Sequence, residues 1–189
     1  MNLPNSLTVA RVFLSVIFVI VLSFDGTYRY AFAFVLFLAA SITDFLDGYL
    51  ARRNNQVTDF GRLMDPLADK IMVTAALVLL AVDQLLPAWF VIVILFREFL
   101  VTGVRMLALA RHQVIAADFW GKLKTVTQIV LICVIFGTLG FREIGLENVA
   151  DWRLWAWAQT ISFWLTLFAT VLSGLLYTRV FARSAKDPA

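Results

Sequence analysis

The chain has 189 residues, of which 61% are hydrophobic and 15% are charged, and its formal net charge is +3. Its mean hydropathy is +0.85 and its pI is about 9.3. This composition excludes an ordinary water-soluble domain, in which about half of the residues are apolar and about a quarter are charged. It predicts an integral membrane protein whose positive charge contacts anionic lipid head groups and not nucleic acid.

Apolar runs separated by turns and polar stretches predict an all-α fold with six transmembrane helices. A hydrocarbon core needs about 20 helical residues, and the connections are short, so we expect a single domain over residues 1–189. We interpret the first run as a retained helix and not as a cleaved signal peptide, because no Lys or Arg precedes Arg11. The expected helices are Leu7 to Phe24, Tyr30 to Arg52, Thr58 to Val82, Leu85 to Ala110, Gly121 to Phe141 and Arg153 to Arg183.

Basic residues are distributed unevenly between the two ends of these helices. Ten Lys or Arg residues fall at the end that holds both termini, and three fall at the other end. Because basic loops stay in the cytoplasm, we expect both termini on the cytoplasmic side. Charged residues inside the second, third and fourth helices lie toward the same side. A single charged side chain that faces lipid has a high free-energy cost. These charged residues predict a shared polar cavity for an active site at the cytoplasmic side.

Four aspartates stand near the cytoplasmic ends of the second and third expected helices. Asp44 and Asp47 are three residues apart, and Asp65 and Asp69 are four apart, so each pair shares one helical face. Oxygen ligands without His or Cys suit Mg²⁺ or Mn²⁺ and disfavour zinc. Magnesium held by few carboxylates usually shares its remaining positions with phosphate oxygens, so the group predicts metal-assisted phosphoryl chemistry. The alternatives are simple pairing with nearby cations and an acid-lined cation transporter.

The aspartates belong to the pattern D-x2-D-G-x2-A-R-x8-G-x3-D-x3-D. Here the sequence resembles the CDP-alcohol phosphatidyltransferases, which have six core helices and transfer a phosphatidyl group from a CDP-linked lipid to an alcohol, releasing CMP. The resemblance implies a homodimer, with metal bound by Asp44, Asp47, Asp65 and Asp69, the last also acting as general base. It implies that the CDP-lipid contacts Asn5, Thr8, Asp44, Gly48, Ala51, Arg52 and Gly61.

Two further segments narrow the choice of acceptor. Residues 97–105 read R-E-x3-T-G-x-R and residues 121–125 read G-K-x-K-T. Both look like segments of the branch of this family that makes phosphatidylglycerophosphate in the bacterial inner membrane, where CDP-diacylglycerol is the donor and sn-glycerol 3-phosphate the acceptor. Inositol phosphate, serine and phosphatidylglycerol are the alternative acceptors. The predicted acceptor-binding residues are Glu98, Thr102, Arg105, Lys122 and Lys124.

The helical geometry of these segments agrees in part with that assignment. Glu98, Thr102 and Arg105 fall on one face of a helix. Arg97 lies about 100° around the helix from Glu98, so we assign it to packing or to another part of the site. Lys122 and Lys124 cannot face the same way in a regular helix, and a frayed helix start would let both reach one anion.

Overall fold

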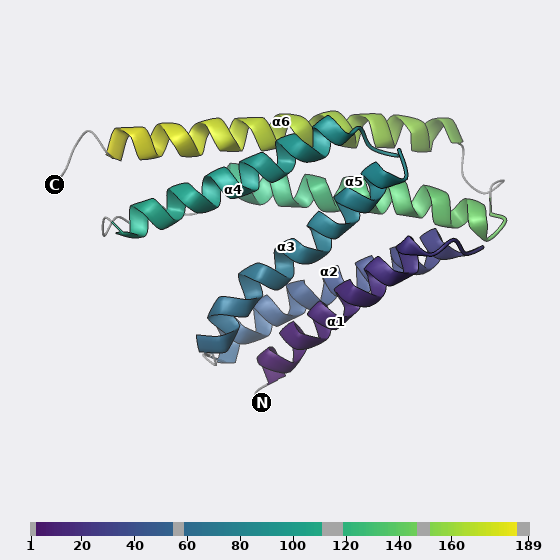
Figure 1. The fold of residues 1–189 in the computed structure, drawn as a ribbon, viewed down its shortest axis with the longest axis horizontal. Helices are drawn as coiled ribbons and strands as arrows, with labels where there is room; N and C mark the ends of the chain where they lie inside the picture. The colour runs from purple at the N-terminus through teal and green to yellow at the C-terminus, as the bar shows by residue number, and fades with distance from the viewer. Residues whose placement is uncertain (1–2, 55–58, 111–118, 147–151, 185–189) are drawn as a thin grey trace.

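A computed structural model describes residues 3–54, 59–110, 119–146 and 152–184, with side chains described for residues 9–43, 70–108, 119–146 and 152–179 (Figure 1). Within these residues the fold is all-α, without strands, and each expected helix is present. The helices are α1 (Leu3–Ser23), α2 (Arg29–Asn54), α3 (Asp59–Val82), α4 (Ala88–Ala110), α5 (Phe119–Glu143) and α6 (Trp152–Ser184).

The largest differences from the predicted boundaries have local causes. Helix α1 begins before Leu7, because Pro4 stands in its first turn, where a missing N–H costs little. Helix α4 begins after Leu85, because α3 ends in a left-handed turn at Gln84, with φ of 59°. The N–H of Leu85 then donates to the carbonyl oxygen of Leu80 at 2.9 Å, which closes the end of α3.

Figure 1 shows α4 and α5 each beside α6, with α1, α2 and α3 below them. The two groups converge where α3 passes into α4 and diverge toward the side on which α1 begins and α6 ends. The core contains aromatic rings from several helices: Phe18 of α1 lies 5.7 Å from Phe136 of α5 and 6.2 Å from Phe37 of α2, measured between centroids. This packing leaves the diverging ends of the helices to form the site.

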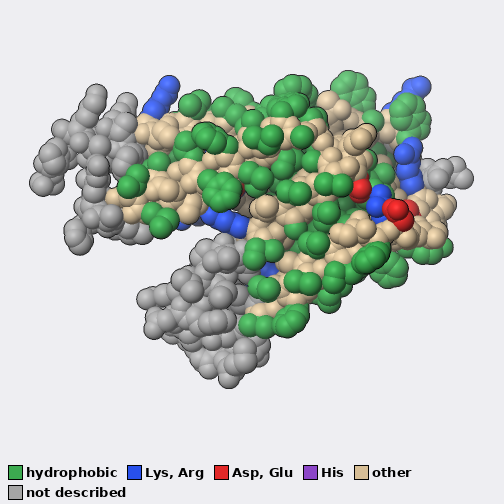
Figure 2. Space-filling view, viewed as in Figure 1, with side chains coloured by type: hydrophobic (Ala, Val, Ile, Leu, Met, Phe, Trp, Pro, Cys, Tyr) green, Lys and Arg blue, Asp and Glu red, His purple; other side chains and the backbone are tan. Residues whose placement is uncertain are grey.

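The outer surface is apolar, as expected for a membrane protein. Figure 2 shows hydrophobic side chains across the visible face, and Phe99 of α4 is 76% exposed. Among the described residues, Phe119–Glu143 and Trp152–Arg179 are long and apolar enough to cross a membrane. Shorter apolar stretches, within the residues whose side chains are described, cover Val9–Ser23, Arg29–Thr43 and Lys70–Val82.

The end of the molecule at which α5 closes against α2 is held by a carboxylate. Glu143 accepts hydrogen bonds from the backbone N–H groups of Tyr30 at 3.2 Å and Ala31 at 2.8 Å, in the first turn of α2. Gly140 permits this contact, because a Cβ there would lie 2.9 Å from the Cα of Ala31. The carboxylate therefore caps a helix that belongs to another part of the chain.

We predict that Glu143→Ala lowers the thermal stability of the detergent-solubilised protein. The substitution removes the acceptor of two N–H groups, at a cost of about 1–3 kcal/mol. Thermal unfolding followed by circular dichroism should show a lower Tm, whereas Arg142→Ala, at the exposed neighbouring position, should leave the Tm unchanged. Equal Tm values for the two variants would contradict the capping role.

Candidate functional site

A cavity of about 640 Å³ lies where α3, α4, α5 and α6 approach one another. Figure 2 shows Lys and Arg side chains in the recess between α3 and α4. Among the described residues that line it, five are cationic and one is a carboxylate, so the cavity strongly favours anions. The structure brings all five predicted acceptor-binding residues into this one lining. The charged lining residues are Lys70, Arg97, Glu98, Arg105, Lys122 and Lys124.

Glu98 of α4 joins two of these cations. Its Oε1 atom accepts a hydrogen bond from the ammonium group of Lys124 on α5 and lies 3.3 Å from Nη1 of Arg97. The side chains of Glu98 and Lys124 are 18% and 7% exposed. A buried charge is tolerated only when it is paired and hydrogen-bonded, so this pair fixes the orientation of α4 against α5 at the cavity wall.

Arg97 packs against α6, as predicted, but it also lines the same cavity as Glu98 and not another part of the site. Its Nε–H donates to Oγ of Ser173 at 3.0 Å. Gly174 leaves room for its methylene groups, because a Cβ there would lie 3.2 Å from Cγ of Arg97. The helical angle between Arg97 and Glu98 separates their Cβ directions, but a long arginine side chain extends around the helix and reaches the same cavity.

Lys70 of α3 was not among the predicted site residues. Its ammonium group donates to Oγ1 of Thr102 at 2.8 Å, and the hydroxyl of Thr102 donates to the carbonyl oxygen of Glu98 at 2.8 Å. Lys70 follows Asp69 directly in the sequence. This adjacency is the sequence signal that could have identified Lys70. It also means that Asp69, the last residue of the aspartate pattern, belongs to the helix turn that lines the cavity.

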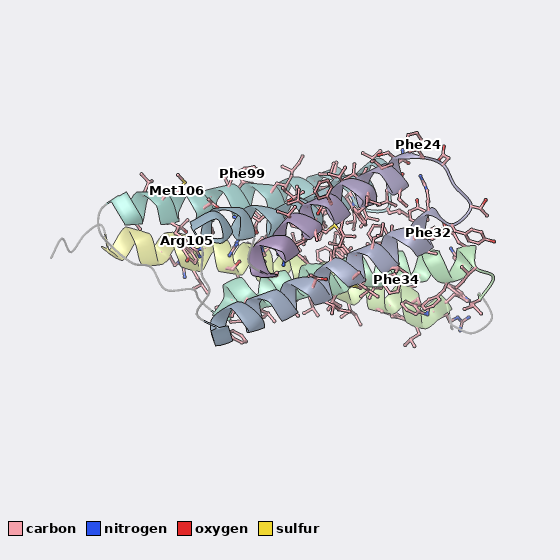
Figure 3. All side chains as sticks on the ribbon, turned by 90° about the horizontal axis from the view of Figure 1, so that it is seen from below. Phe24, Phe32, Phe34, Phe99, Arg105 and Met106 are labelled. Carbon is pink, nitrogen blue, oxygen red and sulfur yellow. The ribbon has the colours of Figure 1, made fainter. Side chains whose placement is uncertain are left out.

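Arg105 lies beside Tyr177 of α6. Its Nη2 donates to the phenolic oxygen at 3.0 Å, and its guanidinium carbon lies 5.9 Å from the centre of the ring. Figure 3 shows Arg105 on the side of α4 that faces α6, whereas Phe99 and Met106 point outward from the opposite side. The hydrogen bond orients one edge of the guanidinium group, because Tyr177 itself is 4% exposed and fixed by its burial.

Lys122 and Lys124 both line the cavity from a helix that is regular from Phe119 onward. A frayed start is therefore not required. Lys124 is buried and is paired with Glu98, whereas Lys122 is exposed. The two lysines reach the same cavity from different faces of α5, one at its wall and one at its rim.

The donor part of the predicted site belongs to helices that contact one another: α1 contacts α2 and α3, and α2 contacts α3. In the part of the chain with described side chains, no three His, Cys, Asp or Glu residues are grouped as a metal site would require. The side chains of the predicted donor and metal residues lie outside that part, so their contacts stay predictions. Asn5 and Thr8 belong to α1, Asp44, Asp47, Gly48, Ala51 and Arg52 to α2, and Gly61, Asp65 and Asp69 to α3.

Comparison with known proteins shows which family and which relatives the chain is similar to. The profile of the family described as CDP-alcohol phosphatidyltransferase matches residues 1–173. A protein of Bacillus subtilis (strain 168) named CDP-diacylglycerol–glycerol-3-phosphate 3-phosphatidyltransferase is 40% identical, with 93% of each chain covered. A protein of the same name from Rickettsia typhi is 35% identical over 93% of this chain and 94% of its own. A probable phosphatidylglycerophosphate synthase of Mycobacterium tuberculosis is 42% identical over 69% of this chain and 64% of its own.

Proposed function

The chain belongs to the CDP-alcohol phosphatidyltransferase family, and from this membership we propose that it transfers the phosphatidyl group of CDP-diacylglycerol to sn-glycerol 3-phosphate. The products are phosphatidylglycerophosphate and CMP, so the enzyme serves phospholipid synthesis. The observation that carries the choice of acceptor is the cationic cavity, in which residues of α4 and α5 offer ammonium, guanidinium and hydroxyl groups to one small phosphorylated polyol. The names of the relatives support the same reaction.

The acceptor phosphate is proposed to bind the exposed cations of the cavity, Arg105 and Lys122, next to the paired Lys124. Arginine offers a planar set of donors to phosphate oxygens, and lysine offers a compact charge. Glu98 and Thr102 hold the neighbouring cations in place, because each of them accepts a hydrogen bond from a lysine. Holding the acceptor in one orientation converts a collision between two substrates into a directed attack.

The donor is proposed to lie against α1, α2 and α3, with its acyl chains in the bilayer. The carboxylates of Asp44, Asp47, Asp65 and Asp69 are hard oxygen donors on two helices that contact each other, and this donor set fits Mg²⁺ or Mn²⁺. When bound, such a metal ion would neutralise charge on the pyrophosphate and on departing CMP. The other predicted contacts of the CDP-lipid are proposed on the basis of the family pattern.

Asp69 is proposed to act as the general base. It accepts the proton of the 1-hydroxyl group of glycerol 3-phosphate as that oxygen bonds to the phosphorus that carries diacylglycerol. The bond from this phosphorus to the oxygen of CMP breaks, and CMP leaves with the electron pair. The carboxylate must approach the hydroxyl within about 3 Å in the complex. The position of Lys70, directly after Asp69, supports this role, because Lys70 lines the acceptor cavity.

The setting of the reaction is proposed to be the bacterial inner membrane. Six membrane-spanning helices, with both termini and the site on the cytoplasmic side, agree with the excess of basic residues at that side. In the structure α1 begins and α6 ends toward the same side, which supports an even number of crossings (Figure 1). A homodimer is proposed from the family resemblance.

The proposed reaction predicts product in one specific assay. Purified protein in mixed micelles with CDP-diacylglycerol and Mg²⁺ should release CMP and form phosphatidylglycerophosphate when glycerol 3-phosphate is added, and a chelator should abolish both. Inositol phosphate, serine and phosphatidylglycerol, supplied separately, should give no product. Product with one of these and none with glycerol 3-phosphate would reject the acceptor. Cation flux in liposomes without any CMP release would instead indicate the transporter alternative.

A further inference from the structure

A second, deeper cavity of about 290 Å³ adjoins the first between α3, α4 and α5. Beyond the residues that the two cavities share, its wall is apolar except for Thr74 and Gln128. A small ligand held by the cations of the first cavity can therefore extend into a largely apolar chamber with few polar groups. The shared residues are Lys70, Glu98, Arg105, Lys124 and Thr125.

Gln128 is the unusual group in this chamber. Its side chain is 2% exposed, and its Nε2 atom has no hydrogen-bond partner within the described part of the chain. Buried polar atoms without a partner are uncommon, because they lose their hydration without replacement. Gln128 follows Lys124 by four residues, so the two side chains share one face of α5. The backbone of Gln128 thus lies about 6 Å farther along α5 than the backbone of Lys124, whose ammonium group lines the acceptor cavity.

We propose that Gln128 determines acceptor specificity by donating a hydrogen bond from Nε2 to the 2-hydroxyl oxygen of the phosphorylated polyol. This inference rests on the proposed function and deepens it. The phosphate remains with the cations at the first cavity, and the three-carbon chain spans the helical turn between Lys124 and Gln128. The 1-hydroxyl is then directed to α3, where Lys70 lines both cavities and Asp69 precedes it.

Contacts from three helices explain why one hydroxylated phosphate would be preferred over its analogues. The phosphate contacts groups of α4 and α5, and the 2-hydroxyl contacts a group of α5. The 1-hydroxyl faces α3. A site with a buried hydrogen-bonding group rejects an analogue that lacks the matching hydroxyl, because the buried group is then left unpaired. An analogue without the 2-hydroxyl keeps the phosphate and the attacking oxygen, and it leaves Gln128 without its partner.

The test compares glycerol 3-phosphate with 3-hydroxypropyl phosphate, which lacks the 2-hydroxyl, as acceptors for the full-length enzyme. We expect the unaltered protein to prefer glycerol 3-phosphate by about tenfold or more in kcat/KM. Gln128→Met should reduce this preference to about twofold, chiefly through slower use of glycerol 3-phosphate, as expected for the loss of one hydrogen bond. Gln159→Met, which changes a half-buried glutamine of α6 outside both cavities, should keep the full preference.

Thermal unfolding separates recognition from a structural role. Methionine removes a buried amide whose donor has no partner, so Gln128→Met should have an unchanged or higher Tm. A lower Tm with an unchanged acceptor preference, or failure of this variant to fold, would overturn the inference. If the unaltered protein makes no product from glycerol 3-phosphate, the proposed function itself fails. If it is active and Gln128→Met keeps the full preference, only the role of Gln128 fails.

Discussion

Asp69→Asn is expected to lower kcat by about 10²–10⁴-fold, the usual contribution of a general base, while CDP-diacylglycerol binding is largely kept. The amide of asparagine has nearly the size of the carboxylate and can still offer one oxygen to a metal ion, but it is a very weak base. The loss should therefore appear in turnover and not in the apparent affinity for the donor. The same substitution should not change the KM for glycerol 3-phosphate by a comparable factor.

The measurement pairs steady-state CMP release with equilibrium binding of radiolabelled CDP-diacylglycerol to the purified protein in mixed micelles. Asp25→Asn is a matched control, because Asp25 is a fully exposed residue in the α1–α2 connection. Near-normal turnover of Asp69→Asn would remove Asp69 as the base. A parallel loss of donor binding would instead assign it chiefly to the metal or donor site.

The helices could be predicted from the sequence because hydrophobic runs and their breakers are local signals. Boundaries were less accurate where backbone geometry decides them. The left-handed turn at Gln84 and the bond from Leu85 to Leu80 end α3, and nothing in the composition of this segment specifies them. The capping of α2 by Glu143 likewise joins residues more than a hundred positions apart, as a contact that only the folded chain defines.

The lining of the cationic cavity was predictable to the extent that its residues belong to short, specific segments. Glu98, Thr102 and Arg105 follow helical spacing, and this spacing places them in one cavity. Residues that other helices add to the cavity have no comparable signal in the sequence. Tyr177 and Ser173 of α6 hydrogen-bond to Arg105 and Arg97 because α6 packs against α4, and the sequence of α6 alone resembles an ordinary membrane helix.

Gln128 shows the same limit for a group inside a predicted helix. It stands one turn beyond the G-K-x-K-T segment, and its position on the face of Lys124 could be read from the sequence. The burial of Gln128 and the lack of a partner for its Nε2 atom among the described residues depend on how α3, α4 and α5 pack, which is a tertiary property. The sequence thus indicates which face of the helix is polar, and the packing decides which polar group faces a cavity.

Arg105→Ala is expected to reduce kcat/KM for glycerol 3-phosphate by about 10- to 150-fold, with an unchanged KM for CDP-diacylglycerol. This range corresponds to about 1.5–3 kcal/mol, the contribution of a hydrogen bond to a charged group. Because Arg105 is exposed, the lower part of the range applies. The loss should lie mainly in the KM for the acceptor, since phosphate binding is made in the ground state and the transition state alike.

Tyr177→Phe tests how much of this effect depends on the orientation of the guanidinium group. The substitution removes the hydrogen bond of 3.0 Å and keeps the ring beside Arg105, so we expect a smaller rise in the same KM. In the double variant the two losses should not add, because Tyr177 acts through Arg105. Thr178→Val is the control: the hydroxyl of Thr178 donates to backbone carbonyls of α6 itself, and its loss should leave the acceptor KM unchanged. Additive effects of Arg105→Ala and Tyr177→Phe would show that Tyr177 acts independently, and an unchanged KM in Arg105→Ala would move the phosphate to the lysines of α5.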